Sequence, residues 1–294
     1  MINKRGDMKI LVTGASGFIG NYVVEEMMKY GHKIIASSKE NSKKIYSTWR
    51  DKVDYIQADL NEDKQNWFTF FDKPDQIIHL AWEGLPNYEK LFHLERNLPN
   101  NYFFLKNMIE NGLKKVVVTG TCLEYGMQNG VLKEDLETKP ENPYALAKDC
   151  LKKYLEQLQK KIAFDLKWIR LFYMYGKGQS QNSILSKLEE ALEKSDKVFN
   201  MSAGEQLRDY LPVEKVAEYI VKISIQDKIT GTINCCSGEP ISIRKLVENF
   251  LAYNNKKIEL NLGYFSYFDY EPMAFWGDNA KLKEVINTKP GGSY

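Results

Sequence analysis

Tyr144 and Lys148 are separated by three residues, and a phenol and an ammonium group at this spacing can hand a proton to a bound carbonyl compound. Positions i and i+4 share one helical face, so the two groups lie one turn apart. A phenol has an unperturbed pKa of about 10, so acting as a base at neutral pH requires a pKa lowered by roughly 3. The Lys148 cation would supply part of that lowering. As an acid, Tyr144 would protonate a carbonyl oxygen that receives hydride.

Thr121 adds a second hydroxyl at the end of an apolar run, Val116 to Val118, that reads as a buried strand. Its hydroxyl would hold the same carbonyl oxygen by a hydrogen bond. A Tyr-x-x-x-Lys pair is common on ordinary helices. The hypothesis therefore needs a partner elsewhere in the chain, a segment that would bind the hydride donor.

That partner is a glycine-rich turn near the start of the chain. An apolar run over 10–13 leads directly into Gly14, Gly17 and Gly20. Such a turn lets backbone amides approach phosphate oxygens and places them at the positive end of a helix. We expect Gly14 to make the turn, Gly17 to admit the phosphates and Gly20 to let helix and strand pack. The sequence therefore predicts a dinucleotide site.

Ser38 and Lys39 follow the second predicted strand, where an acid commonly binds the adenosine ribose of NAD. An Asp within ~4 Å of a 2′-phosphate would repel it by up to about 4 kcal/mol. Its absence favours NADP(H), with NAD(H) as the less favoured cofactor. Ser38 would donate to the phosphate and Lys39 would supply charge, helped by Lys43, Lys44 or Arg50. The alternative is that 39–44 is only a solvated loop.

The chain alternates β-branched runs with amphipathic stretches, which is typical of repeated strand–helix–strand units. We expect an α/β fold with a doubly wound parallel Rossmann sheet and a smaller C-terminal substrate-binding region. The predicted strands are 10–13, 32–37, 54–58, 76–80, 115–120, 165–171 and 232–235. The predicted helices are 20–30, 91–111, 144–161, 183–194 and 243–251, with a segment 210–224 returning to the sheet and an irregular tail over 264–294. Residues 1–173 would form the dinucleotide-binding domain, to which 209–237 returns, and 174–208 and 238–294 the substrate-binding region.

Composition restricts the partners. The net charge is +2 and 27% of the 294 residues are charged, so neither nucleic acid nor an anionic membrane is expected to bind. A membrane span needs roughly 20 apolar residues, and the chain shows neither that nor a signal sequence, so a cytoplasmic location is expected. The four cysteines show no Cys-x-x-Cys spacing and no histidine cluster joins them, so we expect reduced thiols and no metal.

Several motifs resemble those of one family and fall in its order along about residues 8–285. They are Gly14-x-x-Gly17-x-x-Gly20, Asp59-Leu60, His79-Leu80-Ala81, Thr121, Tyr144-x-x-x-Lys148, Arg170 to Gly176, Arg208-Asp209-Tyr210 and Asn234 to Glu239. The chain resembles extended short-chain dehydrogenase/reductases of the nucleotide-sugar epimerase/dehydratase group. The resemblance implies a nucleoside-diphosphate sugar substrate and a homodimer built through a four-helix bundle.

The resemblance also implies where each ligand binds. The predicted cofactor contacts are Gly14, Ser16, Gly17, Phe18, Ile19, Gly20, Ser38, Lys39, Asp59, Leu60, Leu80, Ala81, Thr119, Tyr144, Lys148 and Leu171. Asp59 would meet the adenine edge, or is simply a surface acid, and Lys148 would also hold the nicotinamide ribose. The predicted substrate contacts are Trp82, Thr121, Tyr173 and Arg208.

Two of these contacts have an alternative interpretation, and a third departs from the pattern of the family. Arg208 would clamp the diphosphate with its guanidinium fork, or pair with Asp209. Trp82 would stack on sugar or nicotinamide, or pack in the core. Tyr173 stands where many relatives carry an Asn that touches the substrate.

Cys122 and Leu123 discriminate between reactions. A 4,6-dehydratase resembling this chain would carry Asp-Glu after the threonine, and Leu123 cannot exchange protons. Loss of water and C3/C5 epimerisation are therefore disfavoured. The sequence predicts an NADPH-dependent reductase of a nucleotide-linked 4-keto-6-deoxy sugar, serving surface polysaccharide synthesis. The alternatives are a 4-epimerase with bound NAD and a non-catalytic NADP-binding redox sensor.

Overall fold

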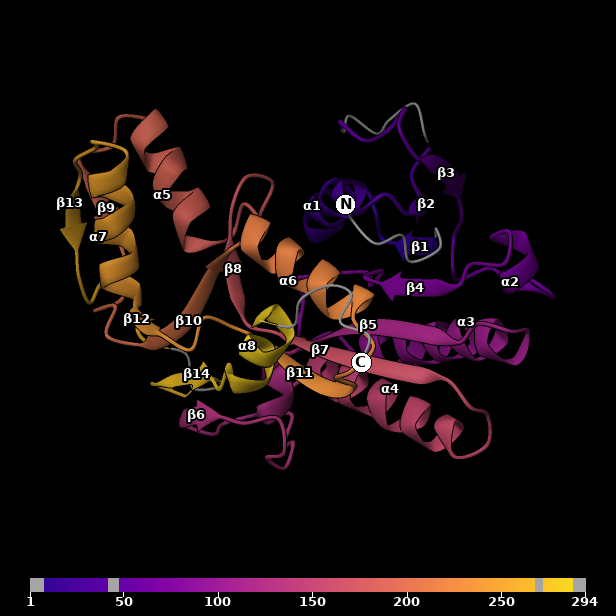
Figure 1. Ribbon diagram of the computed structural model, residues 1–294. Coiled ribbons are helices and arrows are strands. Elements are labelled where there is room, and N and C mark those ends of the chain that lie inside the picture. Colours follow the sequence, from indigo (N-terminus) through magenta and orange to yellow (C-terminus); the bar gives the residue numbers. More distant parts are fainter. Residues whose placement is uncertain (1–7, 42–47, 268–271, 288–294) are drawn as a thin grey trace.

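A parallel sheet of seven strands organises the described part of the chain. The computed structural model describes residues 8–41, 48–267 and 272–287. The sheet has the order β11-β7-β5-β4-β1-β2-β3 (Figure 1). Its strands are β1 (Lys9–Thr13), β2 (Lys33–Ser38), β3 (Asp54–Gln57), β4 (Gln76–His79), β5 (Lys115–Thr121), β7 (Asp165–Leu171) and β11 (Gly231–Cys235).

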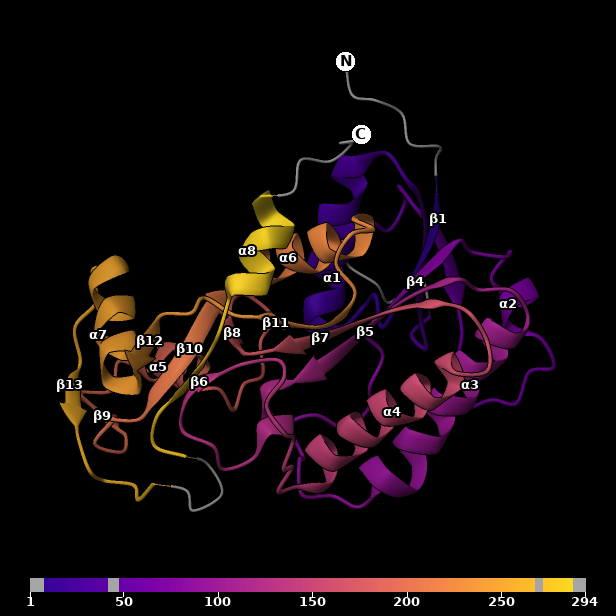
Figure 2. The ribbon, with the colours of Figure 1, turned by 60° about the horizontal axis from the view of Figure 1, so that its bottom comes forward.

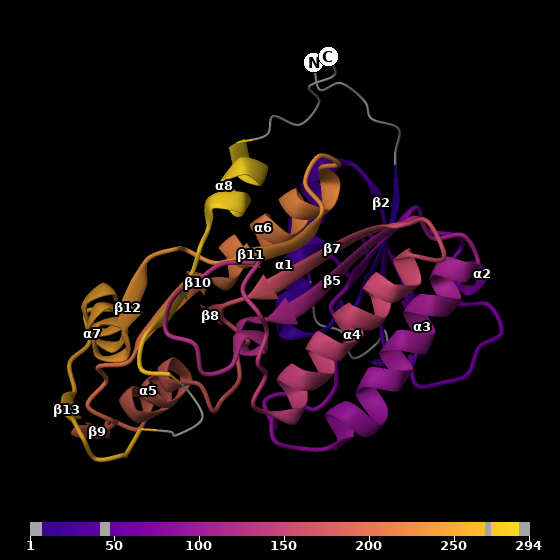
Figure 3. The same cartoon turned by 90° about the horizontal axis from the view of Figure 1, so that it is seen from below.

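Helices cover both faces of this sheet, because successive strand residues point to opposite sides. Ile10 and Val12 pack in one core, whereas Leu11 between them packs in the other. The first core includes α1 (Phe18–Met27), α6 (Val213–Ile225) and α8 (Ala280–Asn287). The second includes α2 (Trp67–Phe70), α3 (Leu98–Glu110) and α4 (Pro143–Gln159), and Figure 3 shows α3 and α4 side by side across the sheet.

The strand order places the site. β1 is hydrogen-bonded to β2 on one side and to β4 on the other. The order of the strands therefore reverses at β1, because β2 and β3 lie on one side of it and β4, β5, β7 and β11 on the other. Ligands of open α/β sheets bind outside the carboxyl ends of the strands at such a switch point. The glycine turn after β1 and the segments after β2 and β4 therefore meet at one edge of the sheet.

Side chains cap the exposed edge of β11. Lys281 Nζ donates to the backbone oxygens of Thr230 and Thr232, at 3.0 and 2.6 Å, and Asn234 N donates to Glu134 Oε1 at 3.0 Å. These bonds occupy groups that would otherwise template pairing with another strand. Figure 2 shows α8, which carries Lys281, above α6 on that side of the molecule.

A second group of elements extends from the carboxyl edge of the sheet (Figure 1). It contains β8 (Tyr173–Tyr175), β10 (Leu207–Pro212) and β12 (Pro240–Ser242) in one small sheet, and β9 (Val198–Asn200) paired with β13 (Glu259–Asn261). Its helices α5 (Ile184–Glu193) and α7 (Ile243–Tyr253) pack around Leu188 and Val247. A short ladder of β6 (Gly130–Leu132) and β14 (Phe275–Gly277) lies beside it. The predicted division at residue 173 stays a prediction.

The predicted fold class is confirmed, and two local predictions are wrong. The first helix begins at Phe18 and not at residue 20, because the turn closes as soon as Gly17 caps it. The tail is not irregular throughout: it contains β14 and α8, and α8 buries Leu282 and Val285 against the sheet core. Residues 268–271 and 288–294 of that predicted tail lie outside the described residues.

Candidate active site

The fold brings Thr121, Tyr144 and Lys148 together. Thr121 is the last residue of β5, and Tyr144 lies in the first turn of α4, whose start is fixed by Asn142 Oδ1 accepting from Ala145 N at 2.9 Å. The Tyr144 phenol lies close enough to the Thr121 side chain to interact with it. All three residues are buried, so a ligand carbonyl at this point would meet fixed polar groups and little water.

Burial raises the pKa of the Tyr144 phenol above its ordinary value of 10, and the interaction with Thr121 offsets only part of the rise. The rings of Trp82, Tyr88 and His93 surround the phenol, with centroids 6.0, 5.4 and 5.3 Å from its own. The pKa of the phenol is therefore raised and not lowered in the ligand-free protein, because desolvation is the largest effect, and the contribution of Lys148 stays a prediction. The phenol is protonated at neutral pH.

Lys148 is held against the strand end and an indole. Its Nζ donates to Thr119 O at 2.9 Å and lies 4.0 Å from the centre of the Trp82 ring. The side chain is 2% exposed, and burial lowers its pKa from 10.5 to about 7. Lys148 therefore changes charge near neutral pH. Such a group can adjust the proton affinity of the neighbouring Tyr144 phenol.

Glu124 positions Thr121, and the sequence reading gave it no role. Thr121 Oγ1 accepts from Leu123 N at 3.2 Å, while Thr121 N donates to Glu124 Oε1 at 2.9 Å. Glu124 also accepts from Trp168 Nε1 at 3.1 Å and from Arg170 Nε at 2.7 Å. The spacing Thr-x-x-Glu is that of a capping box, so this role was visible in the sequence.

Trp82 lies between the catalytic residues and the cofactor cavity described below. Its Nε1 donates to His93 Nδ1 at 3.1 Å, and His93 Nε2 is 3.0 Å from Asn87 O. His93 begins a π-helical turn, His93–Asn97, and is fully buried. His93 thus fixes the indole. Whether Trp82 also stacks on a ligand stays a prediction.

The glycine turn after β1 has the geometry of a phosphate cradle. Gly14 has φ of 71°, and a Cβ there would stand 2.8 Å from Ala81 N. A Cβ at Gly20 would collide with the carbonyl oxygen of Gly14. Because α1 begins at Phe18, the amides of Phe18 and Ile19 lie in its first turn, where a helix offers no acceptor. These features fit the pyrophosphate of a dinucleotide.

A cavity of about 340 Å³ opens along this cradle. The predicted residues that line it are Gly14, Ser16, Gly17, Ser38, Lys39, Asp59, Leu60, Leu80, Ala81 and Trp82. Phe18, Ile19 and Gly20 lie behind it in α1, and Leu171 pairs with Thr121 in the register of β5 and β7. Trp82 lies between the cavity and the predicted catalytic residues. It lines the cavity, and its ring lies against Lys148 Nζ.

Ion pairs and hydrogen bonds occupy the end of the cavity where the adenosine is predicted to bind. Ser38 Oγ is 2.8 Å from Tyr55 Oη, and Lys39 Nζ is 2.9 Å from Glu83 Oε1. Asp59 Oδ1 accepts from Asn61 Nδ2 at 2.7 Å. Of the suggested helpers, Arg50 pairs with Asp51, and Lys43 and Lys44 lie outside the described residues.

The predicted substrate residues Tyr173 and Arg208 lie together on β8 and β10. The Arg208 guanidinium is 5.9 Å from the Tyr173 ring and 4.6 Å from that of Phe275, and Nη1 donates to Leu207 O at 2.9 Å. The alternative partner, Asp209, instead accepts from the amides of Ser237, Gly238 and Gly277, at 2.7, 2.9 and 3.2 Å. The diphosphate clamp stays a prediction.

Comparison with known proteins decides the family. The model of the family described as "NAD dependent epimerase/dehydratase family" matches residues 10–236. The chain belongs to this family.

Two curated relatives of the epimerase/dehydratase chain act at the sugar C4 position according to their names. This chain is 32% identical over 274 residues to the dTDP-6-deoxy-L-talose 4-dehydrogenase (NAD(+)) of Aggregatibacter actinomycetemcomitans, and the match covers 92% of this chain and 99% of the relative. It is 24% identical to the dTDP-4-dehydro-6-deoxyglucose reductase of Escherichia coli, covering 84% and 82%.

The fold of this epimerase/dehydratase is shared with a solved UDP-N-acetylglucosamine 4-epimerase from Methanobrevibacter ruminantium. The TM-score is 0.84 at 22% identity, with 97% of this chain and 93% of the other covered.

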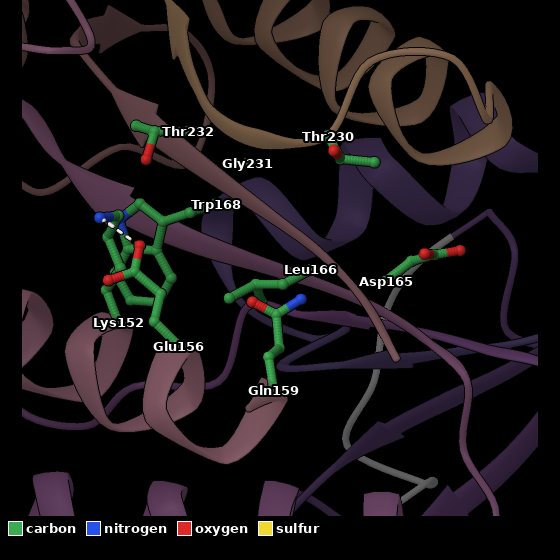
Figure 4. A pocket seen from close by; sticks show the side chains of 9 residues that line it. All are labelled: Lys152, Glu156, Gln159, Asp165, Leu166, Trp168, Thr230, Gly231 and Thr232. Atoms are coloured by element: carbon green, nitrogen blue, oxygen red, sulfur yellow. Dashed lines mark ion pairs between the residues drawn. The ribbon is translucent and has the colours of Figure 1, made fainter. Parts of the chain in front are cut away.

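A second hollow, of about 170 Å³, lies between α4 and the edge formed by β7 and β11. Figure 4 shows the Lys152–Glu156 ion pair, 2.7 Å long, in its wall beside Trp168. None of the predicted site residues lines this hollow.

Residues 8–41, 48–267 and 272–287 contain no group of three or more His, Cys, Asp or Glu side chains arranged to hold a metal ion. In the same part of the chain, every helix is too short or too polar to cross a membrane.

Proposed function

We propose that this chain reduces the C4 keto group of a nucleotide-linked 4-keto-6-deoxy sugar, with NADPH as hydride donor. The observation that carries the proposal is the buried set of Thr121, protonated Tyr144 and Lys148 beside a dinucleotide cradle. Cys122, at the position after Thr121, is a buried thiol, and Leu123 follows it. The site therefore offers one proton donor and no acid–base pair for dehydration.

The roles follow from the geometry. When bound, the nicotinamide cofactor supplies the hydride. Tyr144 gives its proton to the carbonyl oxygen as that oxygen gains charge, and its raised pKa ensures that the proton is present at neutral pH. The Thr121 hydroxyl orients the same oxygen. Lys148, one helical turn from Tyr144, stabilises the phenolate that remains until solvent returns the proton.

The relatives support reaction at C4. The names of the Aggregatibacter and Escherichia proteins both describe oxidation or reduction at that carbon of a dTDP-linked 6-deoxy sugar. A 4-dehydrogenase and a 4-ketoreductase catalyse one reaction in opposite directions, so one site serves both. We propose the direction of reduction, giving a deoxyhexose for surface polysaccharide. The diphosphate would be held by Arg208, and the sugar would lie near Tyr173 and Trp82.

Ser38 and Lys39 support the choice of NADPH, and Glu83 opposes it. Ser38 stands where an acid would bind the ribose hydroxyls of NAD, and Lys39 lines the same end of the cavity. Glu83, however, pairs with Lys39 and reduces the charge available to a 2′-phosphate. We therefore propose NADPH as the donor, with NADH accepted less well.

We also propose a cytoplasmic homodimer. α3 and α4 lie next to each other on one face of the molecule, with Phe103 63% exposed and Tyr154 46% exposed (Figure 3). A second copy of the same pair would cover these rings. Light scattering of the purified protein tests this state, and a monomer would contradict it.

Reduction is tested by mixing the protein with NADPH and the 4-keto product of a dehydratase acting on a dTDP-, GDP- or CDP-hexose. We expect the NADPH absorbance to fall in proportion to protein concentration with at least one nucleotide. If none of the three keto sugars is reduced with NADPH or NADH, the proposal is wrong.

A 4-epimerase with retained NAD is the second candidate. It is favoured by the match to a UDP-glucose 4-epimerase of Halalkalibacterium halodurans, 26% identical over 268 residues. The Lys39–Glu83 pair across the cavity also favours a retained cofactor. Releasing the bound nucleotide with acid and weighing it separates the two: one NAD per chain supports the epimerase, and little bound nucleotide supports the reductase.

A further inference from the structure

Lys39 and Glu83 join two strand ends across the cofactor cavity. Lys39 directly follows β2, and Glu83 lies in the segment after β4. β1 lies between these strands in the sheet, so the ion pair passes over the carboxyl end of β1, where the glycine turn begins (Figure 1). Both side chains line the cavity together with Asp59 and Asn61. The pair therefore stands where the adenosine half of a dinucleotide would enter.

Neighbouring groups hold the Glu83 carboxylate in this place. Arg96 Nη2 is 3.1 Å from Oε2, and Asn61 Nδ2 is 3.3 Å from Oε1. Asn97 Nδ2 donates to the backbone oxygen of Glu83 at 2.9 Å. The Glu83 side chain is 30% exposed, against 57% for Lys39. The acid is the fixed partner of the pair, and the lysine is the one that can move to a ligand.

A 2′-phosphate and a 2′-hydroxyl meet this pair differently. The phosphate carries a charge near −2 and is attracted to Lys39, but it must displace a carboxylate that also repels it. The hydroxyl is uncharged, so it leaves the pair intact. Glu83 therefore opposes only the phosphorylated cofactor.

We propose that Glu83 weakens the preference of this enzyme for the phosphorylated cofactor, by holding Lys39 and repelling the 2′-phosphate of NADP. This inference rests on the proposed function only in that a nicotinamide dinucleotide binds in the cavity. It places a specificity residue 44 positions from Lys39, in the segment after β4 and not at the end of the second strand, which is usually read for this purpose.

The test uses Glu83→Gln, which keeps the size of the side chain and an acceptor for Arg96 and Asn61. Dissociation constants of NADP⁺ and NAD⁺ are measured by calorimetry without any sugar. We expect NADP⁺ to bind about tenfold more tightly to Glu83→Gln than to the wild type, which is about 1.4 kcal/mol, and NAD⁺ to change less than about twofold. Raising the salt should shrink the gain, since the groups are partly exposed.

Two matched variants isolate the pair. Glu62→Gln removes the same charge from a neighbouring surface position, where Glu62 pairs with Lys64, and should leave the NADP⁺ to NAD⁺ ratio unchanged. In a Lys39→Gln background, Glu83→Gln should lose at least half of its effect, measured as log affinity, because the cation that it releases is absent.

The outcomes separate the inference from the proposed function. A ratio that does not change in Glu83→Gln, or that changes equally in Glu62→Gln, overturns the inference. So does a wild type that binds neither dinucleotide. A shifted ratio in a protein that reduces none of the keto sugars upholds the role of Glu83 and rejects the proposed reaction.

Discussion

The proposed site has two ends, the catalytic residues beyond Trp82 and the part of the cavity near Lys39, and their side chains are held differently. At the catalytic end Thr121, Tyr144 and Lys148 are 7%, 7% and 2% exposed, and Thr121 and Lys148 have defined hydrogen-bond partners. At the adenosine end the Lys39 and Glu83 side chains are 57% and 30% exposed and are joined mainly by charge. Buried groups keep one geometry and shifted pKa values, whereas partly exposed pairs are weak and easily rearranged.

This difference indicates which property each end controls. If the proposed function is right, changes among the buried catalytic residues should affect hydride transfer and be costly to activity or folding. Single substitutions near Lys39 should shift the preference between dinucleotides with little effect on stability. The following predictions examine the two ends in order of expected effect.

The largest effect is expected for Tyr144→Phe. Removing the proton donor should lower kcat by about 10³-fold, within the range known for general acids. Dinucleotide affinity and melting temperature should stay near those of the wild type, because the ring remains packed against Trp82 and Tyr88. Tyr154→Phe, on the exposed face of the same helix, is the control and should be fully active. An active Tyr144→Phe protein would remove the phenol from the mechanism.

Lys148→Met should reduce kcat by about 10²-fold and yet raise the melting temperature of the ligand-free protein. Lys148 titrates at about 7 when folded and at 10.5 ordinarily, so between these values only the unfolded chain keeps the proton. The wild type therefore gains stability as the pH rises from 7 toward 10.5, and Lys148→Met does not.

The measurement is thermal unfolding of both proteins across this pH range. The advantage of Lys148→Met should be greatest at and below pH 7 and shrink as the pH rises. Lys152→Met, four residues along α4 in a surface ion pair with Glu156, should show neither effect. A stability difference that is the same at every pH would show that Lys148 is not desolvated.

Glu124→Gln tests positioning. It leaves the buried Arg170 without its counter-charge, so the free energy of unfolding should fall by about 3 kcal/mol. Because Gln still accepts from Thr121 N, kcat should fall only about tenfold with KM unchanged. The exposed Glu137→Gln is the matched control. Full activity in Glu124→Gln would mean that Thr121 needs no support from this side chain.

The smallest effect is expected at the adenosine end. Ser38→Asp should lower kcat/KM for NADPH about tenfold and leave that for NADH within about twofold, because the new acid repels only the phosphate. Ser38→Ala controls for the lost bond to Tyr55. Steady-state kinetics with both cofactors measures this. Equal losses for the two cofactors would show that Ser38 does not face the 2′ position.

The catalytic residues could be predicted from local spacing in the sequence. The arrangement near Lys39 could not, because it depends on contacts between residues far apart in the chain. The glycine turn and the Tyr-x-x-x-Lys pair are each set within one strand–helix unit, so the sequence shows them directly. The Lys39–Glu83 pair joins residues 44 positions apart, and no local pattern announces it. The raised pKa of Tyr144 likewise depends on the rings of Trp82, Tyr88 and His93, which lie in one segment far from Tyr144 in the sequence and bury the phenol.

Other misses had a local signal. Glu124 stands three residues after Thr121 in a capping box, and α8 shows apolar residues at Leu282, Val285 and Ile286, one helical face. The short strands β8, β9 and β12 to β14 had no such signal, since three-residue strands are too brief for alternation to be read.

The most direct test of the account follows the hydrogen that is transferred. The protein is given NADPH carrying deuterium at the transferable C4 position of the nicotinamide, together with a nucleotide-linked 4-keto-6-deoxy sugar, and the product is analysed by NMR. The account predicts one deuterium at C4 of the sugar for each NADPH consumed, and none with Tyr144→Phe over the same time. Interconversion of C4 epimers without consumption of NADPH, or no label at C4, would contradict it.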